Sequence, residues 1–254
     1  MNGLFDLQGR RALITGGSRG IGLAIARALG GVGAQVVLNG RGAAALDEAV
    51  AVLAAEGIAA HAAPFDVCDS AAVAQGVADI EARLGPIDIL VNNAGIQRRA
   101  PLDSFADEDW HALMDTNLNS VFYVSRAVAR GMLARGAGKI INIASVQSEL
   151  ARPNIAPYTA SKGAIRNLTR GMCADWAAKG LQINAIAPGY FDTPLNKALV
   201  EDPVFDAWLR KRTPAGRWGR LEDLHGIAVF LASSASDFVN GQTIFVDGGI
   251  VSVI

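Results

Sequence analysis

The chain has 254 residues, of which 51% are hydrophobic and 19% are charged. This composition provides enough apolar surface for a large core and argues against a disordered chain. The 23 basic and 24 acidic residues form no basic block, so the sequence indicates neither a nucleic-acid partner nor binding to an anionic membrane. We expect the partner to be a small molecule.

The sequence contains no evident membrane-spanning segment and no evident metal-binding motif. The longest stretch free of Asp, Glu, Lys and Arg has 13 residues, which is too short to span a membrane. Because the N-terminus lacks a signal-like region, we expect a cytoplasmic protein. Cys68 and Cys173 lack the spacing of metal ligands, and the three histidines lie far apart. The sequence therefore predicts free thiols and no metal site.

Short apolar runs alternate along the chain with longer amphipathic ones. Seven runs predict strands, at 12–15, 35–39, 58–65, 87–93, 139–145, 181–187 and 243–247. Stretches rich in Ala and Leu predict helices, at 21–32, 43–56, 70–84, 107–135, 158–179 and 221–234. This alternation predicts one Rossmann-type α/β domain over 1–254, doubly wound, with a seven-stranded parallel sheet and helices on both faces.

The segment 188–220 mixes aromatic, charged and proline residues and has neither a helical nor a strand pattern. Irregular loops of this length are uncommon in a compact domain unless they serve a site. We therefore expect 188–220 to be an irregular substrate loop. A peripheral insertion without a role is the alternative.

The sequence TGGSRGIG, residues 15–22, follows the first predicted strand and begins a predicted helix. Glycines in such a turn let the backbone approach a pyrophosphate, whose charge then lies at the positive end of the helix dipole. The spacing G-x-x-x-G-x-G differs from the more familiar G-x-G-x-x-G, but the strand before it and the helix after it favour a dinucleotide site. The residues expected to bind the dinucleotide here are Gly16, Ser18, Arg19, Gly20, Ile21 and Gly22.

The end of the second predicted strand indicates which dinucleotide binds. NAD-binding domains of this type place an acidic residue about 20 positions after the turn, at the ribose hydroxyls, whereas this sequence has Asn39, Gly40 and Arg41 there. The guanidinium groups of Arg19 and Arg41 are suited to pair with a 2′-phosphate. The sequence therefore predicts NADP(H), with Asn39 and Arg41 at the adenosine ribose. Two solvated surface arginines are the alternative.

Tyr158 and Lys162 lie four residues apart in PYTASKGAIRNL, at the start of a predicted helix. This spacing places both side chains on one helical face, where an ammonium favours ionisation of the phenol. A free tyrosine has a pKa of about 10 and is a poor base near neutrality, so a neighbouring cation is a simple way to activate it. Ser145 ends the fifth predicted strand, and its side chain is expected at the same carboxyl edge of the sheet.

The glycine turn, the strand-end serine and the Tyr/Lys pair together resemble the short-chain dehydrogenase/reductase family. The resemblance covers almost the whole chain and includes NNAG at 92–95, Asn117, PG at 188–189, Thr193 and VDGG at 246–249. It implies an enzyme that transfers a hydride between a nicotinamide and a secondary alcohol or ketone.

The same resemblance implies a role for each matching residue. Tyr158 would be the general acid/base, and Ser145 would hydrogen-bond the substrate oxygen. Lys162 would lower the pKa of the tyrosine and hold the nicotinamide ribose, while Asn117 would position a water. The further cofactor contacts it implies are Asp66 and Val67 at the adenine, Asn93, Ala94 and Gly95 along the groove, and Pro188, Gly189, Phe191 and Thr193 around the nicotinamide.

Three stretches resemble the members of this family that act on gluconate and 5-ketogluconate: IQRR at 96–99, SVQSELARPNIAPY at 145–158 and GYFDTPLN at 189–196. A hydroxylated acid needs many hydrogen bonds and a cation. The candidate substrate residues are Ser145, Gln147, Tyr158, Arg98, Arg99 and Arg152, with Glu149 and Asn154 in the same loops. Which arginine binds the carboxylate stays open, because any one of them can instead form a surface salt bridge.

Two other functions remain open. A 3-oxoacyl-carrier-protein reductase would share the catalytic set but needs an apolar acyl channel, and the polar loop after Ser145 weighs against it. A dinucleotide-sensing binding protein without turnover is compatible with the scaffold, but the intact catalytic set weighs against it. The resemblance also implies a homotetramer, in which the helices at 107–135 and 158–179 pair across one interface and the C-terminal strand region across another.

Overall fold

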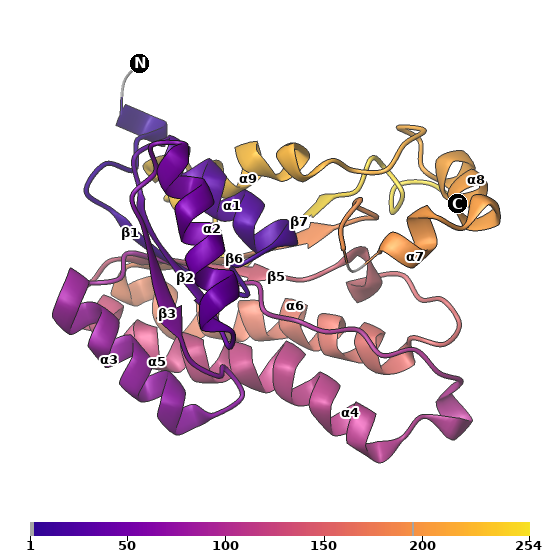
Figure 1. The fold of residues 1–254 in the computed structure, drawn as a ribbon, viewed down its shortest axis with the longest axis horizontal. Helices are drawn as coiled ribbons and strands as arrows, with labels where there is room; N and C mark the ends of the chain where they lie inside the picture. The colour runs from indigo at the N-terminus through magenta and orange to yellow at the C-terminus, as the bar shows by residue number, and fades with distance from the viewer. Residues whose placement is uncertain (1–2, 195) are drawn as a thin grey trace.

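The computed structural model describes residues 3–194 and 196–254, and Figure 1 shows a central sheet with helices on both sides. The strands are β1 (Arg11–Thr15), β2 (Gln35–Gly40), β3 (Ala60–Pro64), β4 (Ile89–Asn92), β5 (Gly138–Ile143), β6 (Leu181–Pro188) and β7 (Thr243–Val246). They form one seven-stranded sheet in the order β3-β2-β1-β4-β5-β6-β7, and neighbouring strands are parallel. The predicted doubly wound parallel sheet is confirmed. Residues 1–2 of the predicted domain and residue 195 of the predicted loop lie outside the described residues.

The fifth strand differs from its prediction in a way that concerns the site. The run at 139–145 predicted that Ser145 ends this strand, but β5 stops at Ile143. Ser145 instead precedes the 3-10 turn Val146–Ser148 and caps it, because its side chain accepts a hydrogen bond from the backbone N–H of Gln147. The serine therefore lies just beyond the carboxyl edge of the sheet, where a cap holds it in place.

Helices cover both faces of the sheet (Figure 1). One face carries α1 (Gly20–Gly31), α2 (Ala43–Ala55) and α9 (His225–Ala232), and the other carries α3 (Ser70–Leu84), α5 (Ser120–Arg135) and α6 (Ala156–Trp176), with α4 (Asp107–Met114) beside α6. Short 3-10 turns lie at Gly3–Phe5, Leu102–Ser104, Val146–Ser148, Ala177–Lys179, Leu221–Leu224 and Ser234–Ser236. Within residues 3–194 and 196–254, no helix has both the length and the apolar character that crossing a membrane requires.

The strands are apolar almost throughout because both of their faces are buried. Ile14 of β1 packs with Ile25 and Leu231 in the core beneath α1, α2 and α9, whereas its neighbour Leu13 packs with Val128 in the core beneath α3, α5 and α6. Successive side chains of a strand point to opposite faces of a sheet. Covering each face with helices therefore requires apolar residues at consecutive positions.

The helical stretch predicted at 107–135 is helical throughout, but its geometry changes in the middle. A π-helical turn at Asp115–Asn119 separates α4 from α5 and contains Asn117. The predicted extent of the helix is therefore confirmed, whereas the π-helical turn was not predicted, since the sequence at this point contains neither proline nor glycine to indicate an irregularity.

The segment predicted as an irregular loop at 188–220 contains two helices, α7 (Lys197–Val200) and α8 (Pro203–Arg212). Asp202 caps α8 by accepting hydrogen bonds from the N–H groups of Val204 and Phe205, and Pro203 occupies the first helical turn. An Asp-Pro start is a recognised signal for a helix N-terminus. The prediction was therefore wrong for this part of the segment, although the segment does border the site.

Candidate active site

A cavity of about 840 Å³ opens at the carboxyl edge of the sheet. The chain leaves β1 toward β2 on one side and leaves β4 toward β5 on the other, so the loops that follow these two adjacent strands diverge. Ligands of open α/β sheets bind in the crevice that such a reversal creates. Residues that follow β1, β2, β4, β5 and β6 line the cavity, and its size suits a small molecule.

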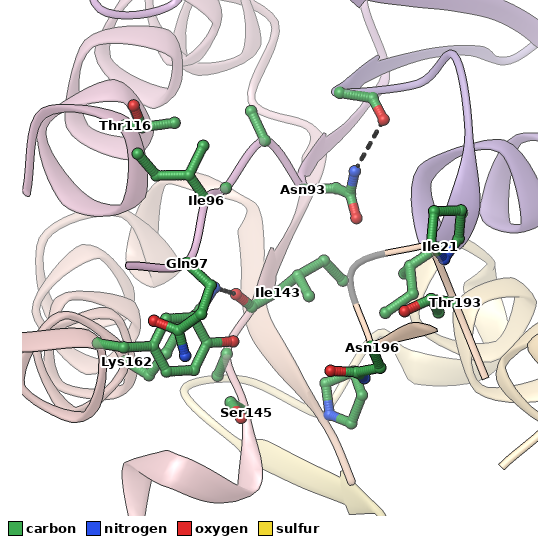
Figure 2. Close-up of a pocket in the computed structure, with 18 of the residues that line it drawn as sticks. Ile21, Asn93, Ile96, Gln97, Thr116, Ile143, Ser145, Lys162, Thr193 and Asn196 are labelled. Carbon is green, nitrogen blue, oxygen red and sulfur yellow. Dashed lines mark hydrogen bonds between the residues drawn. The ribbon is translucent and has the colours of Figure 1, made fainter. Parts of the chain in front are cut away.

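The glycine turn forms one wall, and the loop after β4 lies against it. Gly16 has a φ of +62°, and a Cβ there would lie 3.0 Å from Asn93 Nδ2 and from Ala94 Cα. At Gly22 a Cβ would overlap the carbonyl oxygen of Gly16. Asn93 Nδ2 donates to the carbonyl oxygens of Thr15 and Gly16, at 2.9 and 3.0 Å, and so ties β4 to the turn (Figure 2). Only glycine allows this close approach of two backbones.

This wall fits the phosphates of a dinucleotide. No side chain caps the N-terminus of α1, so its first backbone N–H groups remain available for an anion. Arg19 and Arg41 line the cavity with exposed side chains, and neither pairs with a carboxylate in the part of the chain that the structure describes. Asn39 is buried and donates to the carbonyl oxygens of Ala63 in β3 and Phe65 just after it, at 3.1 and 3.0 Å, so its amide holds β2 to the end of β3.

Lys162 lies at the opposite side of the cavity from Ile21 and Thr193 (Figure 2). Its side chain is 5% exposed, and its Nζ donates to the carbonyl oxygen of Ile143 at 2.7 Å. Burial lowers the pKa of the ammonium to about 8. The Nζ atom lies 5.7 Å from the centre of the Tyr158 ring, one helical turn earlier on α6.

Burial raises the pKa of Tyr158, while a hydrogen bond with Ser145 and the charge of Arg99 act in the opposite direction. Ser145 Oγ accepts the Gln147 N–H at 3.1 Å, which leaves the hydroxyl proton of the serine free to point into the cavity. A phenol and a serine hydroxyl thus meet at one point of the wall. Such a pair can donate to, or accept from, the oxygen of a bound alcohol or carbonyl group.

Asn117 lies behind the cavity rather than on its surface. Its Oδ1 accepts the N–H of Ile96 at 2.8 Å, and its Nδ2 donates to the carbonyl oxygen of Ile96 at 3.0 Å and to Ser161 Oγ at 3.3 Å. The amide therefore clamps the loop after β4 to α6. The π-helical turn aims the side chain at this loop, because it interrupts the regular hydrogen bonding of the helix.

The far end of the cavity is polar and positively charged. Gln147 is buried, and its Nε2 donates to the hydroxyl of Tyr190 at 3.4 Å. Arg99 and Arg152 also line this end, and the charges of both lower the pKa of Tyr190, although burial raises it more. Arg98, in contrast, extends toward α4, where its Nε donates to Asp109 Oδ1 at 3.0 Å.

The structure brings nearly all of the predicted site residues to this one cavity; the exceptions are Gly22, which lies behind the turn, and Asn117. Glu149 is paired with Arg166, and Asn154 is exposed with a φ of +67°. Sequence reasoning missed several lining residues: Phe65, Cys68, Gln97, Thr116, Tyr190 and Asn196. Tyr190 and Gln97 stood within the stretches that carried the resemblance, and adjacency to PG and NNAG was the available signal.

A cavity that joins a phosphate-binding turn to a Tyr/Lys pair is the arrangement of an oxidoreductase that uses a dinucleotide. Comparison with known proteins is more specific, because residues 16–251 match the family model described as enoyl-(acyl carrier protein) reductase. The chain belongs to the short-chain dehydrogenase/reductase family, as the sequence predicted.

Individual relatives are similar over their whole length. Gluconate 5-dehydrogenase of Gluconobacter oxydans (strain 621H) is 63% identical over 97% of this chain and 96% of its own. The 5-keto-D-gluconate 5-reductase of Escherichia coli (strain K12) is 54% identical over 100% of both chains. A crystal structure of a gluconate 5-dehydrogenase from Burkholderia cenocepacia J2315, in complex with NADP and tartrate, has a TM-score of 0.97 and 62% identity over 99% of both chains. The predicted similarity to gluconate 5-dehydrogenases is confirmed.

Proposed function

We propose that this protein is an NADP(H)-dependent oxidoreductase that interconverts gluconate and 5-keto-D-gluconate. The observation that carries the proposal is one cavity in which Tyr158 and Ser145 lie between the glycine turn and a polar end with two arginines, Arg99 and Arg152. The glycine turn suits a dinucleotide, and the polar end with the two arginines suits a hydroxylated acid. The similarity to proteins named for both directions of this reaction supports the substrate.

The side chains perform the proton chemistry. When bound, the nicotinamide supplies or accepts a hydride. In reduction, Tyr158 gives its phenolic proton to the substrate oxygen, and Ser145 donates a hydrogen bond to the same oxygen. The buried Lys162, when charged, stabilises the phenolate that remains. In oxidation the phenolate takes the proton of the alcohol.

The other site residues take the roles that the family resemblance implies. Lys162 holds the nicotinamide ribose, and Asn117 positions a water that links Lys162 to solvent. Support for this role comes from the contact of Asn117 with Ser161, the residue before Lys162. The further cofactor contacts that the resemblance implies are Asp66 and Val67 at the adenine, Asn93, Ala94 and Gly95 along the groove, and Pro188, Gly189, Phe191 and Thr193 around the nicotinamide. All of these residues line the cavity, which supports this assignment.

The proposed cofactor is NADP(H) because the guanidinium groups of Arg19 and Arg41, which form no ion pair with any described residue, lie where the adenosine ribose is expected. In addition, no acidic residue follows β2 directly. A 2′-phosphate gains two charge-assisted contacts there. Similar structures that were crystallised with NADP, including a 2-deoxy-d-gluconate 3-dehydrogenase-like protein from Agrobacterium tumefaciens at 43% identity, support this choice.

We also propose that the protein is a cytoplasmic homotetramer. Apolar side chains on the outer surfaces of α4 and α5 support an assembly: Trp110 is 39% exposed and Phe122 is 43% exposed. Phe238, which precedes β7, is fully exposed at a second position. Exposed aromatic side chains of this kind are typical of subunit contacts.

The test of the function is a panel of NADPH oxidation assays with 5-keto-D-gluconate, other keto-sugar acids and an acetoacetyl thioester. We expect the highest kcat/KM with 5-keto-D-gluconate, because Gln147, Tyr190 and the arginines make the substrate end polar. Preference for the thioester would identify a 3-oxoacyl-carrier-protein reductase instead. Tight NADPH binding without turnover of any substrate would identify a dinucleotide-sensing protein.

A further inference from the structure

An ion pair lies next to the cavity without forming part of its wall. Glu149, which directly follows the 3-10 turn Val146–Ser148, pairs with Arg166 of α6. The side chain of Arg166 is 26% exposed and that of Glu149 is 39% exposed. Neither belongs to the described residues that line the cavity. A substrate in the cavity therefore does not reach the pair, and any role of the pair in the reaction is indirect.

Three side chains on one face of α6 contact the chain at and after the end of β5. Their positions, 158, 162 and 166, are four residues apart, which places them on successive turns of the helix. The contacts are those of Tyr158 with Ser145, of Lys162 Nζ with the carbonyl oxygen of Ile143 at 2.7 Å, and of Arg166 with Glu149. The ion pair thus continues a row of contacts whose first two members belong to the proposed catalytic set.

The position of Ser145 depends on what holds the chain on either side of it. Before the serine, the N–H of Ala144 donates to the carbonyl oxygen of Ile186 at 2.8 Å, so β6 holds this side. After the serine, the N–H of Glu149 donates to the carbonyl oxygen of Val146 at 3.0 Å, which makes Glu149 part of the same turn. A contact that holds Glu149 therefore restrains the turn and, through it, the serine.

The chain between this turn and α6 offers less restraint. It runs through Ala151, Pro153 and Asn154, whose side chains are exposed. Exposed loops are the more mobile parts of a fold. The ion pair bypasses this loop, because it joins Glu149 directly to α6. We therefore expect the pair to fix the distance between the turn and the helix more firmly than the loop does.

The surroundings of Arg166 make the loss of its partner costly in geometry. Its Nε is buried and has no hydrogen-bond partner among the described residues. Without Glu149, a partly buried guanidinium is left with no carboxylate, and it must move toward water to be solvated. Half-exposed ion pairs contribute little to stability. The effect of losing this pair should therefore be a shift of the turn against α6 rather than unfolding.

We propose that Glu149 and Arg166 are positioning residues, whose ion pair keeps Ser145 within hydrogen-bonding reach of Tyr158. This inference rests on the proposed function, because it concerns the same reaction. Ser145 and Tyr158 must meet at one substrate oxygen, and hydrogen bonds weaken steeply when their distance or angle departs from the optimum. A displaced turn should therefore slow the reaction, whereas NADPH bound at the glycine turn should be unaffected.

The test is a double-mutant cycle of Glu149→Gln and Arg166→Gln, assayed with 5-keto-D-gluconate at saturating NADPH. For each single variant we expect kcat to fall about 3- to 30-fold, because the serine donates a weaker hydrogen bond to the reacting oxygen. The double variant should lose no more than the weaker single variant, since both remove the same contact. Arg166→Lys keeps the charge and should recover most of the loss.

The matched control is Glu56→Gln. It breaks the ion pair of Arg27 with Glu56, whose side chains are 37% and 38% exposed, on the face of the sheet opposite α6. We expect kcat of this variant to stay within about twofold of the wild type, because an exposed pair far from the turn contributes little.

A second measurement separates positioning from a merely structural role and needs no substrate. The hydrogen bond with Ser145 lowers the pKa of Tyr158, so a displaced serine should raise this pKa. We expect the tyrosinate absorbance of Tyr158, taken as the difference from the same protein with Tyr158→Phe, to appear at higher pH in Glu149→Gln than in the wild type. A purely structural role would leave this titration where it is.

Each outcome decides for or against the proposal. Unchanged kcat in both single variants overturns the positioning role and leaves the proposed function intact. Additive losses in the double variant, or a loss of kcat with an unmoved titration of Tyr158, also overturn it. If the wild type reduces no keto-sugar acid, the proposed function fails, and the titration alone decides whether the pair positions Ser145. NADPH binding, expected to be unchanged, shows that each variant is folded.

Discussion

Lys162 combines a buried position with a charge. In the folded protein its pKa falls from 10.5 to about 8 through burial, although its Nζ keeps one hydrogen bond, to the carbonyl oxygen of Ile143. Between these two values the unfolded chain binds the proton more tightly than the folded chain does. The contribution of Lys162 to stability is therefore unfavourable below about pH 8, and this penalty disappears as the pH rises toward 10.5.

This gives a prediction for stability against pH. Relative to Lys162→Met, the free energy of unfolding of the wild type should increase by up to about 3 kcal/mol between pH 8 and pH 10.5, since one pKa unit corresponds to about 1.4 kcal/mol. Urea unfolding of both proteins at several pH values measures the difference. If the free energy of unfolding of the two proteins changes with pH in the same way over this range, Lys162 is not held in a desolvated environment.

Arg41 allows a prediction about the cofactor. In Arg41→Ala we expect kcat/KM with NADPH to fall about 10- to 100-fold and kcat/KM with NADH to change little, because only the 2′-phosphate needs the guanidinium. Steady-state kinetics with both cofactors measure this, and Arg83→Ala on the exposed surface of α3 serves as the matched control. An unaltered preference in the Arg41 variant would contradict the assignment of this arginine to the phosphate.

At the scale of elements, the π-helical turn Asp115–Asn119 is the feature that most directly shapes the site. It directs Asn117 to the N–H and carbonyl groups of Ile96, and the loop that carries Arg99 continues from there. We predict that Asn117→Ala lowers the free energy of unfolding by about 1–3 kcal/mol, since it leaves two backbone groups of Ile96 without their partner.

Thermal and urea unfolding of Asn117→Ala measure this loss, with Asn119→Ala as the matched control. Asn119 lies two positions along the same turn, but among the described residues its side-chain amide hydrogen-bonds only to Asp115 of that turn. Equal stability of the two variants would contradict the role of Asn117 in holding the loop after β4 to α6. A loss of activity in Asn117→Ala with no loss of stability would show that the residue acts through water alone.

Most elements of the fold could be predicted from the sequence, but the π-helical turn and α8 were not. Seven strands and most helices were predictable because parallel strands buried on both faces form continuous apolar runs, as in ALIT before the glycine turn. The π-helical turn was not predictable, because no proline or glycine marks it and the contact of Asn117 with Ile96 joins segments 21 residues apart. The helix α8 was predictable in principle from Asp202 and Pro203, and the aromatic residues that follow obscured it.

The site also has features that could be predicted from the sequence and features that could not. Its location followed from the sequence, since the carboxyl ends of parallel strands share one edge and the glycine turn, Ser145 and Tyr158 all belong to that edge. The different surroundings of Arg98 and Arg99 could not be predicted from the sequence. Two adjacent loop residues have the same local pattern, and only the tertiary position of Asp109 separates them.

For the molecule as a whole, the apolar surface of α4 and α5 predicts an assembly. We expect light scattering on a sizing column to give the mass of four chains for the wild type, and the mass of two chains for Phe122→Asp, because a charge at a buried subunit contact is strongly unfavourable. Phe122 is 43% exposed in the isolated chain, so the substitution should leave the fold of the subunit intact. A monomeric wild type would contradict the proposed tetramer.

The central claim is that Tyr158 moves the proton, beside a cofactor held by the glycine turn. The most direct measurement is NADPH-dependent reduction of 5-keto-D-gluconate by the wild type and by Tyr158→Phe, together with NADPH binding by fluorescence. We predict that kcat falls by about 10²- to 10⁴-fold while the dissociation constant of NADPH stays nearly the same. Turnover at the wild-type rate in Tyr158→Phe would contradict the account.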